Sequence, residues 1–324
     1  MHSIDQYRTY FVDYLAEANM RQEPANLYEP IAYILNLGGK RLRPVLTLMA
    51  AEIFNASYKD ALPAAMAVEV FHNFSLVHDD IMDDAPLRRG NETVHEKWDV
   101  NTGILSGDAM LILAYQYFEH YEPAVFHKVA KLFSKTALEV CEGQQWDVDF
   151  ETRDDVSIEE YMKMIQYKTA VLVAAAMQMG AIIAGASDDD QASIYAFGLN
   201  LGIAFQLQDD YLDAFGDPET FGKRVGGDII ENKKTILYLK ARQMATTEQV
   251  SQLEHLYSVQ PTDNQDKIES IKEIFQATGA AGAATEAIEK YTTLAFEALE
   301  NIKLEDDKKM MLMAFGQKLM QRKV

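Results

Sequence analysis

The sequence contains a single cysteine and far fewer basic than acidic residues. Because Cys141 has no partner, an intramolecular disulfide is excluded, and we expect a buried thiol in a reducing, cytoplasmic setting. Thirty Lys and Arg residues against 50 Asp and Glu residues give a formal net charge of −20. This charge argues against binding to nucleic acid or to an anionic membrane surface.

A long hydrophobic run is also missing. The longest lies at 170–186, is slightly short for a membrane-spanning helix and carries Gln178 near its middle. Residues 1–18 lack the basic start and apolar stretch of a signal peptide and are typical of an amphipathic helix. We therefore expect no integral membrane span and a buried core helix at 170–186.

Patterns typical of β-strands are absent. Apolar residues recur at intervals of three and four, the helical period, and no alternating β-branched run has the length of a strand. Eight prolines and 17 glycines are thinly spread at positions that suit helix boundaries, and Ser157 and Glu160 have the spacing of a capping box. Without a low-complexity linker, the sequence predicts an all-α fold in which residues 1–324 form a single domain.

Two clusters of aspartate carry the strongest chemical signal. The first, LVHDDIMDDAPLRRG at 76–90, holds four aspartates, and Pro86 predicts that the preceding helix ends at about Ala85. Carboxylates at that end of a helix meet the negative end of its dipole, and carboxylates one turn apart destabilise a helix by roughly 0.2–0.5 kcal/mol. A bound cation would relieve both effects.

The second cluster, FQLQDDYLDAFGD at 205–217, repeats the Asp-Asp-x-x-Asp spacing at the end of another apolar helical run. Carboxylate ligands with no cysteine nearby favour Mg²⁺ over Ca²⁺ or Zn²⁺, and the loop pattern of an EF-hand is missing. Magnesium normally takes one or two carboxylates together with substrate phosphates, so a phosphorylated substrate is indicated.

Basic residues gather in short groups although the chain is acidic. These groups are Lys40, Arg41 and Arg43; Arg88 and Arg89; Lys223 and Arg224; and Lys233 and Lys234. Each alone is typical of a solvated surface, but beside aspartate clusters and helix ends they indicate clamps for anions. His72 lies seven residues before Asp79 and shares its helical stripe, so it fits either a core histidine or a ligand. The sequence contains neither a glycine-rich loop of the nucleotide-binding type nor the arrangement of a nucleophilic triad. Both absences favour metal-centred chemistry.

Five motifs resemble, in order and spacing, the trans-isoprenyl diphosphate synthases, or polyprenyl synthetases: GGKRLRP (38–44), HDDIMDDAPLRRG (78–90), KTA (168–170), FQLQDDYLD (205–213) and GKRVGGDIIENKKT (222–235). The resemblance implies the isoprenoid synthase fold, a single domain of long, mostly antiparallel helices around a central cavity, and a homodimer. It also implies a head-to-tail condensation of isopentenyl diphosphate with an allylic diphosphate, with two or three Mg²⁺ ions.

The resemblance assigns roles to individual positions. The expected metal ligands are Asp79, Asp80, Asp83, Asp209, Asp210 and Asp213. The residues expected to bind isopentenyl diphosphate are Lys40, Arg43, His72 and Arg89, and those on the allylic side are Arg88, Lys168, Thr169, Gln206, Lys223 and Lys233. Among the latter, the expected catalytic residues are Arg88, Lys168, Thr169 and Gln206: the cations would stabilise the leaving diphosphate, and the Thr169 and Gln206 oxygens would stabilise the carbocation.

Bulky residues upstream of Asp79 are expected to limit product length. Phe74 and Phe71 lie five and eight positions before Asp79, roughly 8 and 12 Å along a helix, and core packing is the alternative interpretation of both. Some farnesyl synthases of the family carry two extra residues inside the first motif, which this sequence lacks. It therefore resembles short-chain synthases that make geranylgeranyl diphosphate, with farnesyl diphosphate close behind.

Other interpretations stay open. Terpene cyclases, head-to-head prenyl synthases and longer-chain polyprenyl synthases also carry aspartate clusters, but the first two do not call for a second diphosphate clamp. A non-catalytic subunit of a heteromeric synthase is disfavoured because both aspartate motifs and all clamp residues are present. The preferred primer, the pathway and the subunit contacts are not specified by the sequence.

Overall fold

The computed structural model describes residues 1–18, 20, 22–217 and 225–321. The chain divides into two compact units, each assembled from separate segments: Met1–Thr136 with Ala175–Tyr195, and Ala137–Ala174 with Ala196–Val324. Since neither unit is a continuous stretch of sequence, no single linker separates them. The expectation of one domain over the whole chain stays a prediction.

The described residues are almost entirely helical, which confirms the all-α prediction. The first unit contains α1 (Ile4–Glu17), α2 (Ala25–Asn36), α3 (Leu42–Ile53), η1 (Tyr58–Ala61), α4 (Leu62–Met82), β1 (Leu87–Arg88), β2 (Asn91–Glu92), α5 (Val94–Lys97), α6 (Val100–Gln116) and η2 (Tyr117–His120). The second contains α8 (Ile158–Ile165), η3 (Gln166–Ala170), α12 (Gly227–Ile230), α13 (Ile236–Met244), α14 (Thr247–Ser258), α15 (Gln265–Ala277), α16 (Ala280–Glu300) and α17 (Asp306–Met320). Three helices contribute residues to both: α7 (Pro123–Thr152), α9 (Val171–Ile183) and α10 (Asp188–Phe215).

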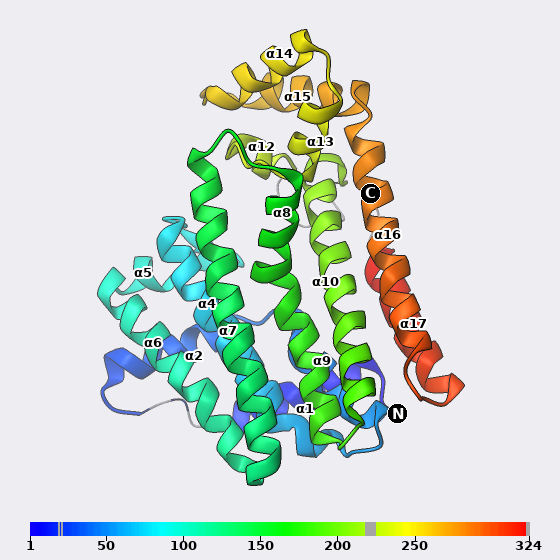
Figure 1. The fold of residues 1–324 in the computed structure, drawn as a ribbon. Coiled ribbons are helices and arrows are strands. Elements are labelled where there is room, and N and C mark those ends of the chain that lie inside the picture. The colour runs from blue at the N-terminus through cyan, green and yellow to red at the C-terminus, as the bar shows by residue number, and fades with distance from the viewer. Residues whose placement is uncertain (19, 21, 218–224, 322–324) are drawn as a thin grey trace. The chain divides into compact units, whose positions relative to one another are not determined.

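Helix α4 organises the first unit and carries the first aspartate cluster at its C-terminal end. Pro63 lies in its first turn, where the missing N–H costs nothing, and most of its apolar side chains are buried. It packs against α3, and also against α5 and α6, both of which lie near it in Figure 1. The helix ends at Met82, earlier than the predicted Ala85, because Asp84 adopts the left-handed conformation with φ 48°. Pro86, four residues after the last helical residue, therefore marked the boundary only approximately.

Most of the segment 170–186 is a buried helix, as predicted, although the helix ends at Ile183. The side chains of α9 are almost all buried, and a β-carbon at Gly180 would collide with the α3 backbone at Thr47 and Ala51. In the described part of the chain, no helix is both long and apolar enough to cross a membrane. The expected burial of Cys141 is wrong: on the long helix α7 this residue is exposed.

The second unit is built around the buried side chains of α8, α10, α13, α15 and neighbouring segments. The predicted capping box is confirmed, since Ser157 and Glu160 bond reciprocally at the start of α8. After Ile165 the helix widens into a π-turn, η3, before continuing as α9. Gly143 of α7 lies against this turn, where a β-carbon would come within 2.8 Å of the Lys168 Cα atom. The close approach of α7 to the π-turn therefore requires glycine.

Candidate active site

The first aspartate cluster lies at the end of α4 and is tied to the β1–β2 hairpin through Arg88. Asp80 is 1% exposed and accepts two hydrogen bonds from the Arg88 Nε, at 2.9 and 3.2 Å, and another from Nη2. Arg88 Nη2 also lies 3.8 Å from Asp79 Oδ2. Burial raises the pKa of Asp80, and the bonds and charge of Arg88 offset only part of that rise. The hairpin thus places one fixed cation against the aspartates.

Arg43 and Arg89 of the first unit lie near His72, beside this cluster. Arg43 Nη1 lies 3.1 Å from His72 Nε2, and because arginine only donates, Nε2 is the acceptor and the imidazole proton resides on Nδ1. Desolvation lowers the pKa of His72 well below its ordinary value, and the neighbouring guanidinium groups, Arg43 first, lower it further. His72 is therefore neutral at physiological pH and leaves the positive charge to the arginines.

The loop that precedes α3 carries Lys40 and contacts Arg89 of the β1–β2 hairpin, and both are candidate residues for isopentenyl diphosphate. Arg89 donates from Nη1 to the carbonyl of Gly38, and its guanidinium lies so close to Gly39, where φ is 121°, that a β-carbon there would be 2.8 Å from it. Lys40 is exposed. Arg43, His72 and Arg89 are thus brought together, and Lys40 projects from the same loop.

Arg41 is placed differently from the anion clamp that the sequence suggested. It is 6% exposed and pairs with the buried Glu69, and it also donates to the carbonyl of Leu35. Asn73 in turn donates to Glu69 Oε1 at 3.1 Å. Arg41 therefore stabilises the loop from inside the unit instead of offering its charge to a ligand. A glutamate inside the apolar run of α4 was the signal in the sequence for this buried partner.

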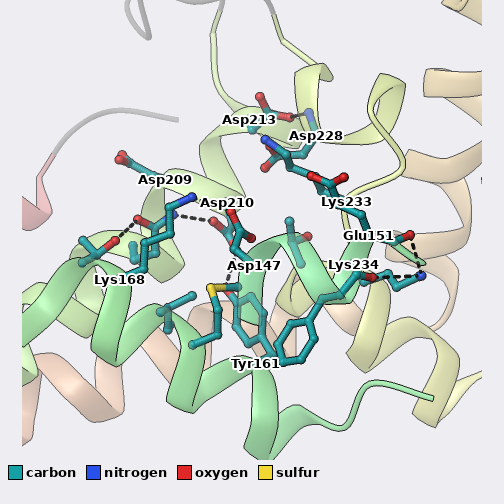
Figure 2. Close-up of a pocket in the computed structure, with 16 residues that line it drawn as sticks. Asp147, Glu151, Tyr161, Lys168, Asp209, Asp210, Asp213, Asp228, Lys233 and Lys234 are labelled. Carbon is teal, nitrogen blue, oxygen red and sulfur yellow. Dashed lines mark hydrogen bonds and ion pairs between the residues drawn. The ribbon is translucent and has the colours of Figure 1, made fainter. Parts of the chain in front are cut away.

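The second aspartate cluster lines a pocket of the second unit with a volume of about 240 Å³ (Figure 2). Asp209, Asp210 and Asp213 come from α10, and Lys168 and Thr169 come from the π-turn. π-turns are rare in proteins as a whole but common at functional sites. This distortion therefore marks Lys168 and Thr169, the first two residues of the KTA motif.

A chain of hydrogen bonds orders the wall of the pocket. Thr169 Oγ1 donates to Gln206 Oε1 at 3.1 Å, and Gln206 Nε2 donates to Asp210 Oδ1 at 2.9 Å. The buried Tyr161 hydroxyl donates to the other oxygen of Asp210. Lys168 pairs with Asp147 of α7, whose side chain also faces the pocket (Figure 2). Tyr161 and Asp147 were missed in the sequence, because neither lies within a motif of clustered charge.

Asp228 is a further acid of the pocket that the sequence analysis missed. Its backbone N–H donates to Asp213 Oδ2 at 2.9 Å, and its carboxyl lines the same cavity. Desolvation raises the pKa of both Asp210 and Asp228, and the charges of neighbouring aspartates raise them further. Six carboxyl side chains line the pocket, and the four aspartates of α10 and α12 among them fit a hard divalent cation, which would relieve this repulsion. The signal in the sequence was its place in GGDII between two basic pairs, Lys223-Arg224 and Lys233-Lys234.

The two lysines of the doublet Lys233-Lys234 behave differently from each other. Lys233 faces the pocket and forms an ion pair of 2.8 Å with Glu231, which raises the lysine pKa although burial lowers it. Lys234 donates to the carbonyls of Phe150, at 3.2 Å, and of Arg153, and thereby anchors the segment that follows α7. Lys223 and Arg224 lie outside the described residues.

The two candidate length-determining residues lie along α4. Phe71 is fully buried and packs on Phe133, with ring centroids 5.1 Å apart, whereas Phe74 is 8% exposed and packs on His78 at 4.8 Å. The two rings also contact each other, at 5.4 Å. Phe71 is thus enclosed by the core, and Phe74 lies nearer to the aspartates, as its sequence position predicts.

Comparison with known proteins now identifies the family. Residues 24–275 match the family model for polyprenyl synthetase, which is more than half of the chain. The chain belongs to the polyprenyl synthetase family. It is 42% identical over 260 residues to geranylfarnesyl diphosphate synthase of Natronomonas pharaonis, covering 75% of each chain. It is 43% identical over 220 residues to geranylgeranyl diphosphate synthase of Methanosarcina mazei, covering 67% of this chain and 68% of that one.

A solved structure agrees with the sequence relatives. The crystal structure of a geranylgeranyl pyrophosphate synthase is 56% identical and superposes with a TM-score of 0.96 over 100% of both chains. The predicted polyprenyl synthetase resemblance, the isoprenoid synthase fold and the enzyme class, a transferase of prenyl groups, are therefore confirmed. Family members use allylic diphosphates and isopentenyl diphosphate, and the two relatives are named as a geranylfarnesyl and a geranylgeranyl diphosphate synthase.

Proposed function

We propose that this polyprenyl synthetase condenses isopentenyl diphosphate head-to-tail with an allylic diphosphate and releases geranylgeranyl diphosphate. The observation that carries the proposal is the pocket in which Asp209, Asp210, Asp213 and Asp228 converge with Lys168 and the Thr169–Gln206 pair. Such a pocket suits a diphosphate held through metal ions at one side and a developing carbocation at the other.

The carboxylates of the two aspartate clusters would hold Mg²⁺, two or three ions by analogy with the family. When bound, Mg²⁺ neutralises the diphosphate and polarises the bond to the leaving group. Without this neutralisation, each close pair of like charges would cost about 4 kcal/mol at an effective dielectric constant near 20. The donor set supports magnesium over softer metals, because the described residues that line the pocket offer carboxylate oxygens and include neither cysteine nor histidine.

The protein's own residues perform the remaining steps. Arg88, Lys168, Lys223 and Lys233 stabilise the charge that builds on the departing diphosphate. The hydroxyl oxygen of Thr169 and the amide oxygen of Gln206, which bond each other at 3.1 Å, present lone pairs to the allylic cation. Lys40, Arg43 and Arg89, with neutral His72 as a hydrogen-bonding partner, orient isopentenyl diphosphate for attack. The released diphosphate is the base for the final proton.

The decisive experiment measures products of the purified chain. Isopentenyl diphosphate and Mg²⁺ are supplied with dimethylallyl, geranyl or farnesyl diphosphate, and the products are identified by mass spectrometry. We expect geranylgeranyl diphosphate as the main product. Failure to release diphosphate from any primer would contradict the proposal and favour a non-catalytic subunit, whereas a cyclic hydrocarbon would favour a terpene cyclase.

Magnesium binding is expected to release protons. Because the metal-free carboxyls of Asp210 and Asp228 have raised pKa values, they hold protons between the ordinary aspartate pKa of about 3.9 and those raised values. Magnesium requires the ionised form, so its apparent affinity increases as the pH rises through this window and then levels off. Calorimetric titration in buffers of different ionisation enthalpy measures the release. A proton count of zero across this window would contradict the expectation.

Product length is expected to depend on Phe74. Replacing Phe74 by alanine removes the bulky side chain nearest the aspartates, so we expect products longer by at least one isoprene unit in a radiolabelled isopentenyl assay. Phe275→Ala provides the matched control, because Phe275 of α15 is equally aromatic and buried, and its loss creates a cavity of comparable size. An unchanged product from Phe74→Ala would show that this residue is not the floor. The relative in Natronomonas pharaonis is named a geranylfarnesyl diphosphate synthase. A product one isoprene unit longer is therefore a plausible outcome of the substitution.

We further propose a homodimer and a cytoplasmic setting. Helix α6 exposes four large apolar side chains between 41% and 59%: Val100, Ile104, Leu105 and Ile112. A helix face of this kind is typical of a surface that a second copy covers. Sedimentation equilibrium measures the stoichiometry directly. The cytoplasmic setting is supported by the single cysteine.

A further inference from the structure

Three potential metal ligands cluster outside the residues assigned above. Asp84, His95 and Glu96 each present one ligand atom, and these atoms lie within 4.8 Å of one another. Asp84 follows the end of α4, whereas His95 and Glu96 belong to the short helix α5. The two carboxylates are exposed, but His95 is only 8% exposed.

The buried histidine is the observation that points to a ligand. Both ring nitrogens of His95 are buried, and neither has a hydrogen-bond partner. Its Nε2 lies 3.8 Å from Glu96 Oε1, which is too long for a hydrogen bond. Buried polar atoms are almost always satisfied, so an exception calls for an explanation such as a bound ion. A metal between the imidazole and the two carboxylates supplies that explanation.

The backbone around the cluster is well tied. Thr93 Oγ1 donates to the carbonyl of Ala85 at 2.8 Å, and the Thr93 N–H donates to the carbonyl of Pro86 at 3.2 Å. These bonds join the segment after Asp84 to the start of α5. The neighbouring Lys97 lies 3.9 Å from the centre of the Tyr33 ring, and among the described residues no lysine or arginine pairs with Asp84 or Glu96.

We propose that Asp84, His95 and Glu96 bind a divalent transition-metal ion, zinc above the others, at a site separate from the magnesium ligands. One imidazole nitrogen and two carboxylates form a donor set that suits zinc, whereas magnesium prefers oxygen alone. Two ligand atoms at about 2.0–2.2 Å from one zinc ion lie at most about 4.4 Å apart. The exposed side chains of Asp84 and Glu96 can close the small remaining gap by rotation, while His95 stays fixed.

Such a metal would link the two ends of the segment that contains the β1–β2 hairpin. His95 follows Asp84 by eleven positions, and the chain between them carries Arg88 and Arg89. Closing this loop restricts the conformations open to the hairpin. The effect on substrate binding rests on the proposed function, because it assumes that these arginines bind diphosphates. Metal binding itself does not depend on that assumption.

The test measures zinc on the full-length protein without substrate. The chain is incubated with ZnCl₂ in excess MgCl₂ and desalted, and its metal content is determined by mass spectrometry. We expect the wild type to retain about one equivalent more zinc than His95→Gln and Asp84→Asn, with affinity at least about tenfold weaker in both variants. His127→Gln, at an exposed histidine of α7, is the matched control and should bind as the wild type does.

A second measurement addresses the histidine directly. In nitrogen-15 NMR spectra of the wild type, zinc should shift the ring signals of His95, and circular dichroism reports whether each variant folds. If His95→Gln fails to fold, Asp84→Asn decides, because asparagine also tolerates the left-handed backbone of this exposed position. Equal zinc content in wild type and Asp84→Asn, or unmoved His95 signals, would overturn the proposal.

Discussion

Replacing Asp80 by asparagine should lower the rate of diphosphate release by about 10³-fold. Asp80 is the most buried member of the first cluster and has two roles in the proposed mechanism, as a metal ligand and as the partner that orients Arg88. Asparagine keeps the shape but removes the charge, so both roles are weakened together. Steady-state kinetics with saturating Mg²⁺ measure the effect.

The expected loss of activity in Asp80→Asn exceeds what lost stability could cause. Leaving Arg88 with a weaker partner should reduce the free energy of unfolding by about 1–3 kcal/mol, which thermal unfolding followed by circular dichroism would show. Asp189→Asn is the matched control, because Asp189 is an exposed aspartate in the first turn of α10. A folded Asp80→Asn variant with activity within tenfold of the wild type would remove Asp80 from the mechanism.

Lys168→Ala is expected to reduce kcat by about 10²–10³-fold with a much smaller change in KM. The ammonium group faces the pocket from the π-turn and pairs with Asp147, so it is held where charge builds on the leaving diphosphate. An interaction that strengthens in the transition state affects kcat more than substrate binding. Pre-steady-state and steady-state kinetics separate the two constants.

Lys163→Ala serves as the matched control for Lys168→Ala. Lys163 lies five residues earlier on α8, is exposed and contacts the ring of Tyr167 at 4.6 Å, so its loss changes the local charge without emptying the pocket. We expect its kcat to match the wild type. If Lys168→Ala raised KM while kcat stayed constant, the lysine would bind the substrate without stabilising the transition state.

The helical fold and the aspartate clusters could be predicted because both depend on patterns among residues close together in the sequence. The apolar period of three and four residues predicts the helices, and the capping box at Ser157 predicts the start of α8. Asp209 and Asp213 are one turn apart on a continuous helix, as expected. At the first cluster the prediction was less accurate, because the left-handed Asp84 ended α4 before the proline could.

Residues that act through contacts distant in sequence could not be predicted. Asp228 joins the second cluster through a backbone bond to Asp213, fifteen positions earlier, and Tyr161 reaches Asp210 across 49 positions. The burial of a charged residue cannot be read from the local sequence either. Arg41 resembles its basic neighbours in GGKRLRP, but it is buried against Glu69. Cys141 shows the reverse error, since a typical core residue type lies on an exposed face.

The π-turn at Gln166–Ala170 also restricts how this region can change over evolution. A π-turn is equivalent to one extra residue inserted into an α-helix, and each residue of an α-helix turns the chain by about 100°. Deleting a single residue here would restore regular helical winding and rotate α8 by that angle relative to Val171 and the residues that follow. Tyr161 would then no longer reach Asp210. Substitutions that keep Lys168 and Thr169 can therefore accumulate in this stretch, whereas insertions and deletions should be eliminated by selection.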